Sequence, residues 1–377
     1  RNHLHPGSFH LPAGTVVRKK GTAMHTLWRK MAAACLGAVL FLGAAGCSSK
    51  PAADNKGKGA GPYANLPKVV LVGGDSSGKG SVGQRFGERV AQKVAERTGG
   101  QLTIDYHPNA ELGGDEDLLR QLRANDIQLV VGQMAPVTAF VPEGAVFDLP
   151  MVFAPYEGKT IGRVLNEDGP FRRKLAEAYD RAGLHYMGTL QNGTYRLMTS
   201  NRPVKEAEDF RGLKIRTMSN RNHMAFWSAL GANPTPLAWP ELYFSLQSGI
   251  VDAEENAADT IVSANFNEVQ KYVAETNVIL YANEMVLNKK AYESLPEPYQ
   301  KVLEEAVQEA MGELAPTLVQ VDRDCKEKLQ KKGMVLVTYP PEFYEAVRNQ
   351  PPVQELYRKI DAQTGGLGTL MMEELGK

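Results

Sequence analysis

The feature that most constrains this chain of 377 residues is an alternation of short apolar runs with longer amphipathic segments. Residues 68–72 predict a strand, and residues 82–98 repeat apolar side chains at intervals of four, which is typical of a helix with one buried face. A strand over 101–106, a helix over 115–124 and a strand over 127–131 follow. This order predicts an α/β fold with a mostly parallel sheet and helices on both faces.

The pattern starts again after residue 200, which indicates a second lobe. Residues 213–216 predict a strand, followed by helices over 219–230 and 240–248. A long helix with a kink at a proline is expected over 296–332. A late strand over 334–337 and a helix over 341–359 are expected after it. About 310 residues follow position 67, which is too many for one ordinary core and enough for two lobes.

The N-terminal part predicts export. Residues 24–46 contain a basic pair, an apolar run of 16 residues and small residues that end at Gly46. A membrane-spanning helix needs about 20 apolar residues, so we interpret this segment as a signal peptide. The small residues before Cys47 resemble a lipobox, which predicts that Cys47 becomes the lipidated first residue of the mature protein. Secretory cleavage nearby without lipidation is the alternative.

The segments around the signal peptide carry little fold information. Residues 1–23 lack export features, and we interpret them as non-native upstream sequence. Residues 47–67 are small and polar, which predicts a flexible tether. After cleavage and lipidation Cys325 is the one thiol left, so no internal disulfide is expected.

Charge argues against a nucleic-acid partner. Six of the 43 Lys and Arg residues, and none of the 43 Asp and Glu residues, precede position 48, so the rest of the chain carries a net charge of −6. Nucleic acids require basic patches. Positive charge for a smaller anion must therefore come from individual arginines.

Catalytic and metal motifs are missing from the sequence. The loop 73–80 resembles a phosphate-binding P-loop, but Gly80 stands where the motif needs Ser or Thr. We interpret the loop as one whose backbone and side chains at Asp75, Ser76 and Ser77 line a ligand cleft. Zinc-protease and nucleophile-elbow patterns do not occur, so we expect no catalytic residue, metal or cofactor. His223 is expected in the cleft or on the surface.

Two arginines predict an anion-binding site. Arg196 and Arg216 stand at the ends of apparent strands, and ligands in such sheets bind beyond the carboxyl ends of the strands. A planar guanidinium pairs with a carboxylate through two parallel hydrogen bonds, which lysine cannot reproduce. A structural ion pair at a strand end is the alternative interpretation of Arg216.

An ordered set of motifs gives these residues a family context. The chain resembles the solute-binding proteins of TRAP (tripartite ATP-independent periplasmic) transporters, of the DctP type, over about residues 68–340. The segments that carry the resemblance are Glu111–Asp115, Phe147–Pro150, Tyr195–Thr199, Phe210–Arg216, Leu230–Pro234, Glu241–Asp252 and Asn265–Tyr272. The resemblance implies a two-lobed flytrap fold with mixed, mostly parallel sheets and a long helix that spans both lobes.

The resemblance also implies lobe boundaries and site residues. Residues 68–193 plus 282–320 would form the first lobe, and 194–281 plus 321–377 the second. Arg216 would bind the substrate carboxylate, with the remaining substrate-binding candidates being Arg196, Asn256, Trp239, Asp75, Ser76, Ser77, Asp115, Gln133 and Ser219. The family's usual Gln-Glu-Asn-Pro is replaced here by Glu254-Glu255-Asn256-Ala257, which puts the shape of that loop in doubt. Arg221 is a further base that is either a contact or a surface residue.

The implied function is capture of an organic acid outside the cytoplasm, in the periplasm or at the cell surface. C4-dicarboxylates, sialic acid and similar carboxylates fit the residues. The acid would pass to the small and large membrane subunits of a TRAP permease, and a lipid would anchor the binding protein to the membrane. Two alternatives stay open: a binding protein coupled to an ABC transporter or a receptor, and a secreted enzyme that uses carboxylates in the cleft.

Overall fold

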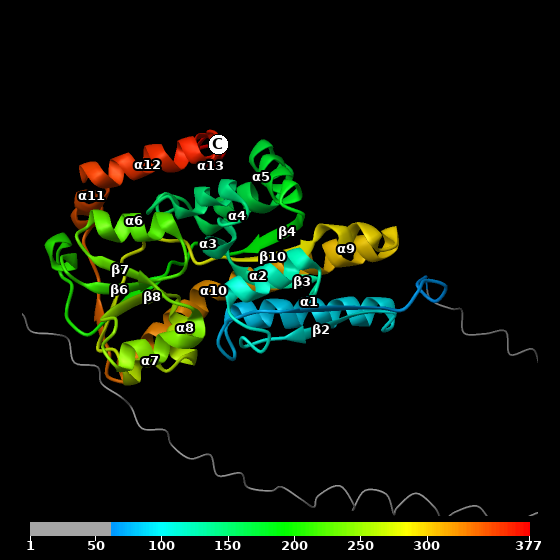
Figure 1. The fold of residues 1–377 in the computed structure, drawn as a ribbon, viewed down its shortest axis with the longest axis horizontal. Coiled ribbons are helices and arrows are strands. Elements are labelled where there is room, and N and C mark those ends of the chain that lie inside the picture. The colour runs from blue at the N-terminus through cyan, green and yellow to red at the C-terminus, as the bar shows by residue number, and fades with distance from the viewer. Residues whose placement is uncertain (1–61) are drawn as a thin grey trace, which may run out of the picture. The chain divides into compact units, whose positions relative to one another are not determined.

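Two β-sheets organise the protein. The computed structural model describes residues 62–377, so the predicted signal peptide, Cys47 and most of the tether lie outside the described residues. The first sheet has the strand order β2-β1-β3-β10-β4, and the second has the order β11-β9-β5-β8-β6-β7 (Figure 1). We call the part built on the first sheet lobe 1 and the part built on the second sheet lobe 2.

Lobe 1 follows the predicted alternation of strands and helices. Its helices α1 (Val82–Thr98) and α2 (Asp115–Ala124) have the predicted bounds. Ser81, the serine beside the P-loop-like segment, is the N-cap of α1 and accepts a hydrogen bond from the backbone N–H of Gln84. The strands of this sheet are β1 (Val69–Gly74), β2 (Leu102–His107), β3 (Leu129–Gln133), β4 (Leu184–Leu190) and β10 (Asn283–Asn288).

Lobe 2 has shorter strands. They are β5 (Leu197–Ser200), β6 (Lys214–Thr217), β7 (Asn233–Pro236), β8 (Ala253–Asn256), β9 (Tyr272–Ala274) and β11 (Val335–Val337). One strand in each sheet runs against its neighbours: β10 is antiparallel to β3 and β4, and β5 is antiparallel to β8 and β9. Both sheets are therefore mixed.

The antiparallel strands follow from the way the chain crosses between the lobes. β4 runs into β5 of the other sheet, and β9 runs into β10 in return. A strand that enters a sheet at the edge where the other strands end must run against them. The two crossing segments pair with each other, because Arg196 N–H donates to the Ile279 carbonyl at 2.9 Å and Tyr281 N–H donates to the Thr194 carbonyl at 2.8 Å.

The long helix α10 (Glu297–Lys331) is a third connection. It continues through Pro316 and contacts α1 and β4 of lobe 1 as well as α8 (Ala258–Ser263) and β11 of lobe 2. The prediction of a two-lobed α/β fold with a long helix spanning both lobes is therefore confirmed.

The predicted helix over residues 341–359 is wrong in its extent. Two helices occur there, α11 (Pro341–Arg348) and α12 (Pro351–Gln363), because the Pro351-Pro352 pair lacks backbone N–H groups and disfavours helical conformation in the residue before it. A further helix, α13 (Leu367–Leu375), packs on α4 (Gly158–Asn166) and α5 (Pro170–Arg181) beside the first sheet. The assignment of 321–377 to lobe 2 stays a prediction.

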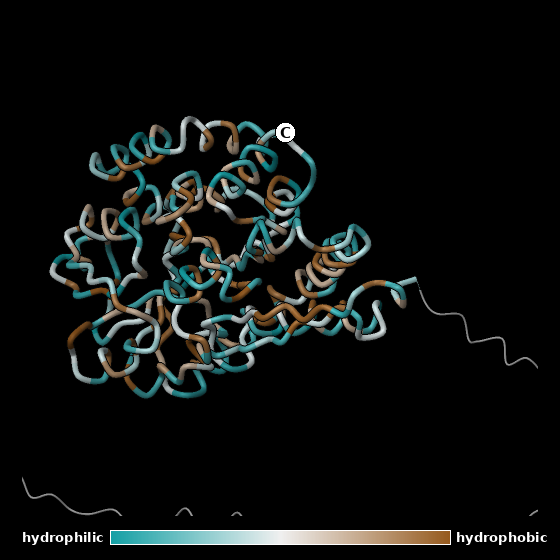
Figure 2. The backbone as a smooth tube through the Cα atoms, turned by 45° about the vertical axis from the view of Figure 1, so that its right-hand side comes forward, coloured by the Kyte–Doolittle hydropathy of each residue, from teal (hydrophilic) through white to brown (hydrophobic). Residues whose placement is uncertain are grey.

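The remaining helical segments are short or cover the sheet edges. Their bounds are α3 (Met134–Val137), α6 (Arg221–Ala229), α7 (Leu242–Gln247), α9 (Lys289–Ser294), η1 (Pro142–Asp148), η2 (Ala207–Phe210), η3 (Trp239–Glu241) and η4 (Phe266–Glu268). Hydropathy alternates along the helices, as expected for helices that bury one face (Figure 2). None of the helices in residues 62–377 has both the length and the hydropathy needed to cross a membrane.

Close packing of α1 on β2 gives a matched pair of glycine variants. A Cβ atom at Gly87 in α1 would lie 2.0 Å from Cζ of Tyr106, whereas a Cβ atom at Gly312 in α10 meets no atom within 4 Å. Gly312→Ala is expected to stabilise the fold by about 0.5–1 kcal/mol, because alanine favours helix. Gly87→Ala is expected to destabilise it by about 1–3 kcal/mol through overpacking. Urea denaturation of both variants checks this, and equal stabilisation by both would contradict it.

A buried carboxyl in β10 predicts a pH dependence of stability. Glu284 is 2 % exposed and hydrogen-bonded to the Tyr179 hydroxyl, and burial raises the pKa of Glu284 from 4.5 to about 8. Between these values the folded protein keeps a proton that the unfolded chain releases, so the free energy of unfolding falls as pH rises from about 4.5 to 8. Glu284→Gln removes this loss, which is roughly 2–5 kcal/mol.

The measurement is urea denaturation at pH 5 and pH 8. Glu284→Gln should flatten the change between the two pH values relative to the unmodified protein. Glu293→Gln, which alters an exposed carboxylate of α9, should leave the change as it is. An identical pH dependence in all three proteins would show that Glu284 is not the group responsible.

Candidate functional site

The carboxyl ends of the strands in lobe 2 gather three predicted site residues. Arg216 is the penultimate residue of β6, Asn256 ends β8, and Arg196 directly precedes β5. The register of β5 against β8 pairs Leu197 with Asn256, so the start of β5 and the end of β8 share one edge of the sheet. The antiparallel direction of β5 therefore brings Arg196 to the same edge as Arg216.

Arg216 is buried at the wall of a cavity. Its side chain is 2 % exposed, and its Nε donates to the Leu237 carbonyl at 3.0 Å. It forms no ion pair with any of the residues 62–377. The cavity has a volume of about 180 Å³ and is lined by Gly114, Asp115, Glu116, Asp117, Arg120, Pro136, Arg216, Met218, Ser219, Leu237, Ala238 and Trp239. Residues of both lobes thus enclose it.

The electrostatics of Arg216 reflect this burial. Loss of water, followed by the positive charge of Arg196, lowers the pKa of Arg216 from 12.5 to about 10, and the carboxylates of Glu254 and Asp115 oppose the shift. The guanidinium therefore remains charged at neutral pH. A buried cation without a paired anion is costly, so a ligand anion in the cavity would be strongly favoured.

Arg196 connects the two lobes. Its side chain is 1 % exposed, and its NH1 donates to Oε1 of Gln133 in lobe 1 at 3.0 Å. Its NH2 donates to the backbone carbonyl of Glu255 in lobe 2. Arg196 and Gln133 line a second cavity of only about 10 Å³, and neither lines the cavity beside Arg216.

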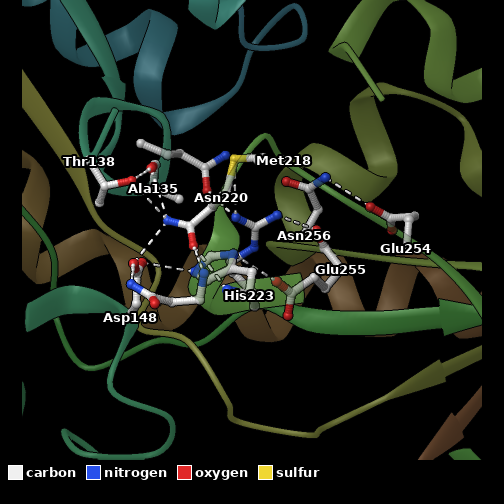
Figure 3. A network of polar contacts seen from close by, with 12 residues as sticks. Ala135, Thr138, Asp148, Met218, Asn220, His223, Glu254, Glu255 and Asn256 are labelled. Carbon is white, nitrogen blue, oxygen red and sulfur yellow. Dashed lines mark hydrogen bonds and ion pairs between the residues drawn. The ribbon is translucent and has the colours of Figure 1, made fainter. Parts of the chain in front are cut away.

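A buried polar cluster surrounds Arg196. His223 of α6 lies between two carboxylates, with its Nε2 3.1 Å from Oδ1 of Asp148 and its Nδ1 3.6 Å from Oε1 of Glu255 (Figure 3). Asn220 donates through Nδ2 to Oδ2 of Asp148 at 2.9 Å and to the Ala135 carbonyl at 3.0 Å. Asp148 and Ala135 belong to lobe 1, so this cluster holds the lobes together.

Sequence reasoning missed Asp148 and Asn220. Asn220 also caps α6 by accepting from the N–H groups of Asn222 and His223, and an asparagine before a helix is a signal that could have identified it. No pattern in the sequence connects it with Asp148, 72 residues away. The surface position considered for His223 is wrong, since its side chain is 1 % exposed.

The lobe 1 candidates separate into two groups. Asp115, at the start of α2, lines the cavity and accepts a hydrogen bond from the Ser76 hydroxyl. Asp75 accepts from the Tyr106 hydroxyl at 2.6 Å and from the Ser77 N–H at 2.8 Å, and burial raises the pKa of Asp75 to about 6. Asp75, Ser76 and Ser77 do not line the cavity beside Arg216.

The lobe 2 candidates also separate. Ser219 and Trp239 line the cavity, and the Trp239 ring packs on Phe266 with centroids 5.7 Å apart. Asn256 points to Glu254 and donates to its Oε2 at 2.8 Å (Figure 3). Asn256 lines neither cavity. Arg221 is exposed and does not line the cavity.

The carboxyl group of Glu254 in β8 lies close enough to Arg216 and Arg196 to interact with their charges. Glu254 is fully buried and also accepts from the Thr199 hydroxyl at 3.0 Å. Burial raises the pKa of Glu254 to about 7, and Arg216 and Arg196 oppose that rise.

Among residues 62–377, no three His, Cys, Asp or Glu side chains lie close enough to hold a metal ion.

The structure thus gathers Arg216, Asp115, Ser219 and Trp239 around one cavity between the lobes. It places Arg196 and Gln133 next to each other beside a smaller cavity. The remaining candidates line neither cavity and form hydrogen bonds with neighbouring residues instead; they are Asp75, Ser76, Ser77 and Asn256.

Comparison with known proteins identifies the family to which this chain belongs. The sequence profile of the family described as "Bacterial extracellular solute-binding protein, family 7" (DctP) matches residues 75–364. The sialic acid-binding periplasmic protein SiaP of Vibrio cholerae is 28 % identical over 300 residues, which are 79 % of this chain and 90 % of that protein. The C4-dicarboxylate-binding periplasmic protein DctP of Rhodobacter capsulatus is 30 % identical over 233 residues, which are 62 % of this chain and 67 % of that protein.

A solved structure adds evidence from the fold. A TRAP periplasmic solute-binding protein from Polaromonas, bound to D-erythronate, is 27 % identical with a TM-score of 0.72, and the match covers 80 % of this chain and 98 % of that one. The match of the profile over most of the chain and the likeness of the fold lead to one conclusion. This chain belongs to family 7 of the bacterial extracellular solute-binding proteins, the DctP family of TRAP solute-binding proteins.

Proposed function

We propose that this protein captures a carboxylate-bearing organic acid between its lobes and delivers it to the membrane subunits of a TRAP permease. One observation carries the proposal: the charged guanidinium of Arg216 is buried at a cavity between the lobes and pairs with no carboxylate of residues 62–377. The relatives support the class of ligand, since SiaP is named for sialic acid and DctP for C4-dicarboxylates.

The residues around the cavity suit recognition of such an acid. Nε of Arg216 already donates to the Leu237 carbonyl, which fixes the guanidinium plane. The two terminal nitrogens can then bind both oxygens of a ligand carboxylate in parallel. Trp239 would cover an apolar part of the ligand, and Ser219 would supply a hydroxyl. The site binds and releases its ligand without chemical turnover.

Closure of the lobes would couple binding to delivery. Hydrogen bonds across the lobes, such as Arg196 to Gln133 and Asn220 to Ala135, describe a closed arrangement. The crossing segments and α10 can act as hinges between rigid lobes. A ligand favours the closed form only by binding it more tightly than the open form. We propose that the permease recognises this closed form.

Arg216 is the residue on which binding is expected to depend most. Arg216→Ala is expected to weaken binding of the cognate acid by more than about a hundredfold, because loss of one member of a buried ion pair costs about 3–5 kcal/mol. Arg216→Lys is also expected to bind weakly, since lysine lacks the bidentate geometry. A thermal-shift screen of organic acids on residues 48–377 supplies the ligand, and titration calorimetry measures its affinity.

Arg221→Ala is the matched control, because Arg221 is exposed and outside the cavity. It is expected to bind like the unmodified protein. Arg216→Ala without ligand should melt no lower than the unmodified protein, since Arg216 has no carboxylate partner to lose. Near-native affinity in folded Arg216→Ala protein would refute the role of Arg216.

We also propose that a lipid on Cys47 anchors the protein to a membrane after residues 24–46 are removed. The support is the sequence around Cys47, whose preceding residues are Ala44-Ala45-Gly46. Attached acyl chains contribute about 0.8 kcal/mol per buried methylene, so more than one chain would hold the protein firmly. The anchor would keep it near its permease.

Fractionation of expressing cells tests the anchor. Cys47→Ser is expected to move the protein from the membrane fraction to the soluble fraction, because the thiol that carries the lipid is gone. Cys325→Ser is the matched control and should stay with the membrane, since Cys325 lies in α10. Membrane association of the Cys47→Ser protein equal to that of the control would contradict lipidation at this position.

A further inference from the structure

The charges on the two sides of the cavity differ. Lobe 2 contributes the guanidinium of Arg216, whereas lobe 1 contributes the first turn of α2 with the carboxylates of Asp115, Glu116 and Asp117. Arg120 forms an ion pair with Asp117, and its NH1 lies 3.8 Å from Oε2 of Glu116. Asp115 forms no ion pair within residues 62–377, and its hydrogen-bond partner is the Ser76 hydroxyl. The carboxyl group of Asp115 therefore has no cationic partner within residues 62–377.

The second arginine is not available to a ligand in this cavity. Arg196 is bound to Gln133 and to the Glu255 carbonyl, and it does not line the cavity. The Met218 side chain lines both cavities, and its sulfur lies 3.5 Å from NH1 of Arg196. Of the two arginines that line the cavity within residues 62–377, Arg120 is paired with acidic side chains, so Arg216 is the guanidinium left for one ligand carboxylate.

The N-terminus of α2 does not supply a second anion site. A helix N-terminus attracts negative charge, but three acidic side chains already occupy the first turn of α2. Asp117 accepts from the Gly114 N–H at 3.4 Å, which uses one of the free backbone donors. A second ligand carboxylate at the N-terminus of α2 would be repelled by the acidic side chains of its first turn.

The size of the cavity also limits the ligand. Its volume of about 180 Å³ lies below the roughly 300–1,000 Å³ of common small-molecule pockets. A compact acid fits this space better than a nine-carbon sugar acid.

We infer that the cavity selects a short monocarboxylate that carries hydroxyl groups, such as a four- to six-carbon sugar acid, over a dicarboxylate of the same length. This inference rests on the proposed function of the same site. Arg216 binds the carboxylate, and Asp115 on the opposite wall accepts a hydrogen bond from a ligand hydroxyl. A dicarboxylate would place its second negative charge against Asp115, and like charges in a closed cavity repel strongly.

The test compares two four-carbon acids, D-erythronate and succinate, by titration calorimetry at one pH and ionic strength. The unmodified protein is expected to bind D-erythronate at least tenfold more tightly than succinate. Asp115→Asn removes the negative charge and keeps the shape, so it should weaken D-erythronate binding and bring the two affinities within about threefold of each other. Circular dichroism confirms that each variant is folded.

Asp126→Asn is the matched control, because Asp126 is an exposed carboxylate just beyond the other end of α2. It should leave both affinities unchanged. Equal or tighter binding of succinate by the unmodified protein, or an unchanged ratio in Asp115→Asn, would overturn the inference and leave the proposed function intact. Failure of a panel of four- to six-carbon hydroxy acids and dicarboxylates to bind at all would overturn both.

Discussion

Burial of two guanidinium groups between the lobes is the constraint on which the site depends. Arg196 donates to the side-chain carbonyl of Gln133 and to the backbone carbonyl of Glu255, so its interactions hold the lobes together. Arg216 keeps one hydrogen bond to a carbonyl and otherwise faces the cavity. The two arginines therefore differ: Arg196 bridges the lobes, and Arg216, in the function proposed above, would bind the ligand. The low dielectric of the surroundings would strengthen the interaction of Arg216 with an incoming carboxylate.

The crossing of the chain explains why these groups meet. The strand reached by each crossing must enter its new sheet at the edge where the parallel strands end. That edge is also where ligands bind in open α/β sheets. The crossing segments thus support the candidate site, and they would also be the hinge in the proposed closure. Arg196 illustrates this, because its backbone pairs with Ile279 of the other crossing while its side chain bridges the lobes.

Local patterns in the sequence predicted the parts of the fold that local physics determines. Helices α1 and α2 followed from apolar spacing, and the position of Arg216 at a strand end followed from the short run before it. The break at Pro351 was also local, and proline chemistry could have located it. The cluster of His223, Asp148 and Asn220 could not be predicted, since it joins residues that no local pattern relates. The hydrogen bond from Asn256 to Glu254 is different, because alternate residues of a strand share one face and this contact is local.

The place of β10 within the first sheet has a consequence for biogenesis. β10 lies between β3 and β4, although it comes almost 100 residues after β4 in the chain. Until residues 283–288 emerge, β3 and β4 lack a common neighbour and present unpaired backbone groups. Contacts between such distant parts of a chain form slowly. The first sheet of this protein can therefore be completed only after residues 283–288 have been made, so β10 is among the last parts of the sheet to find its place.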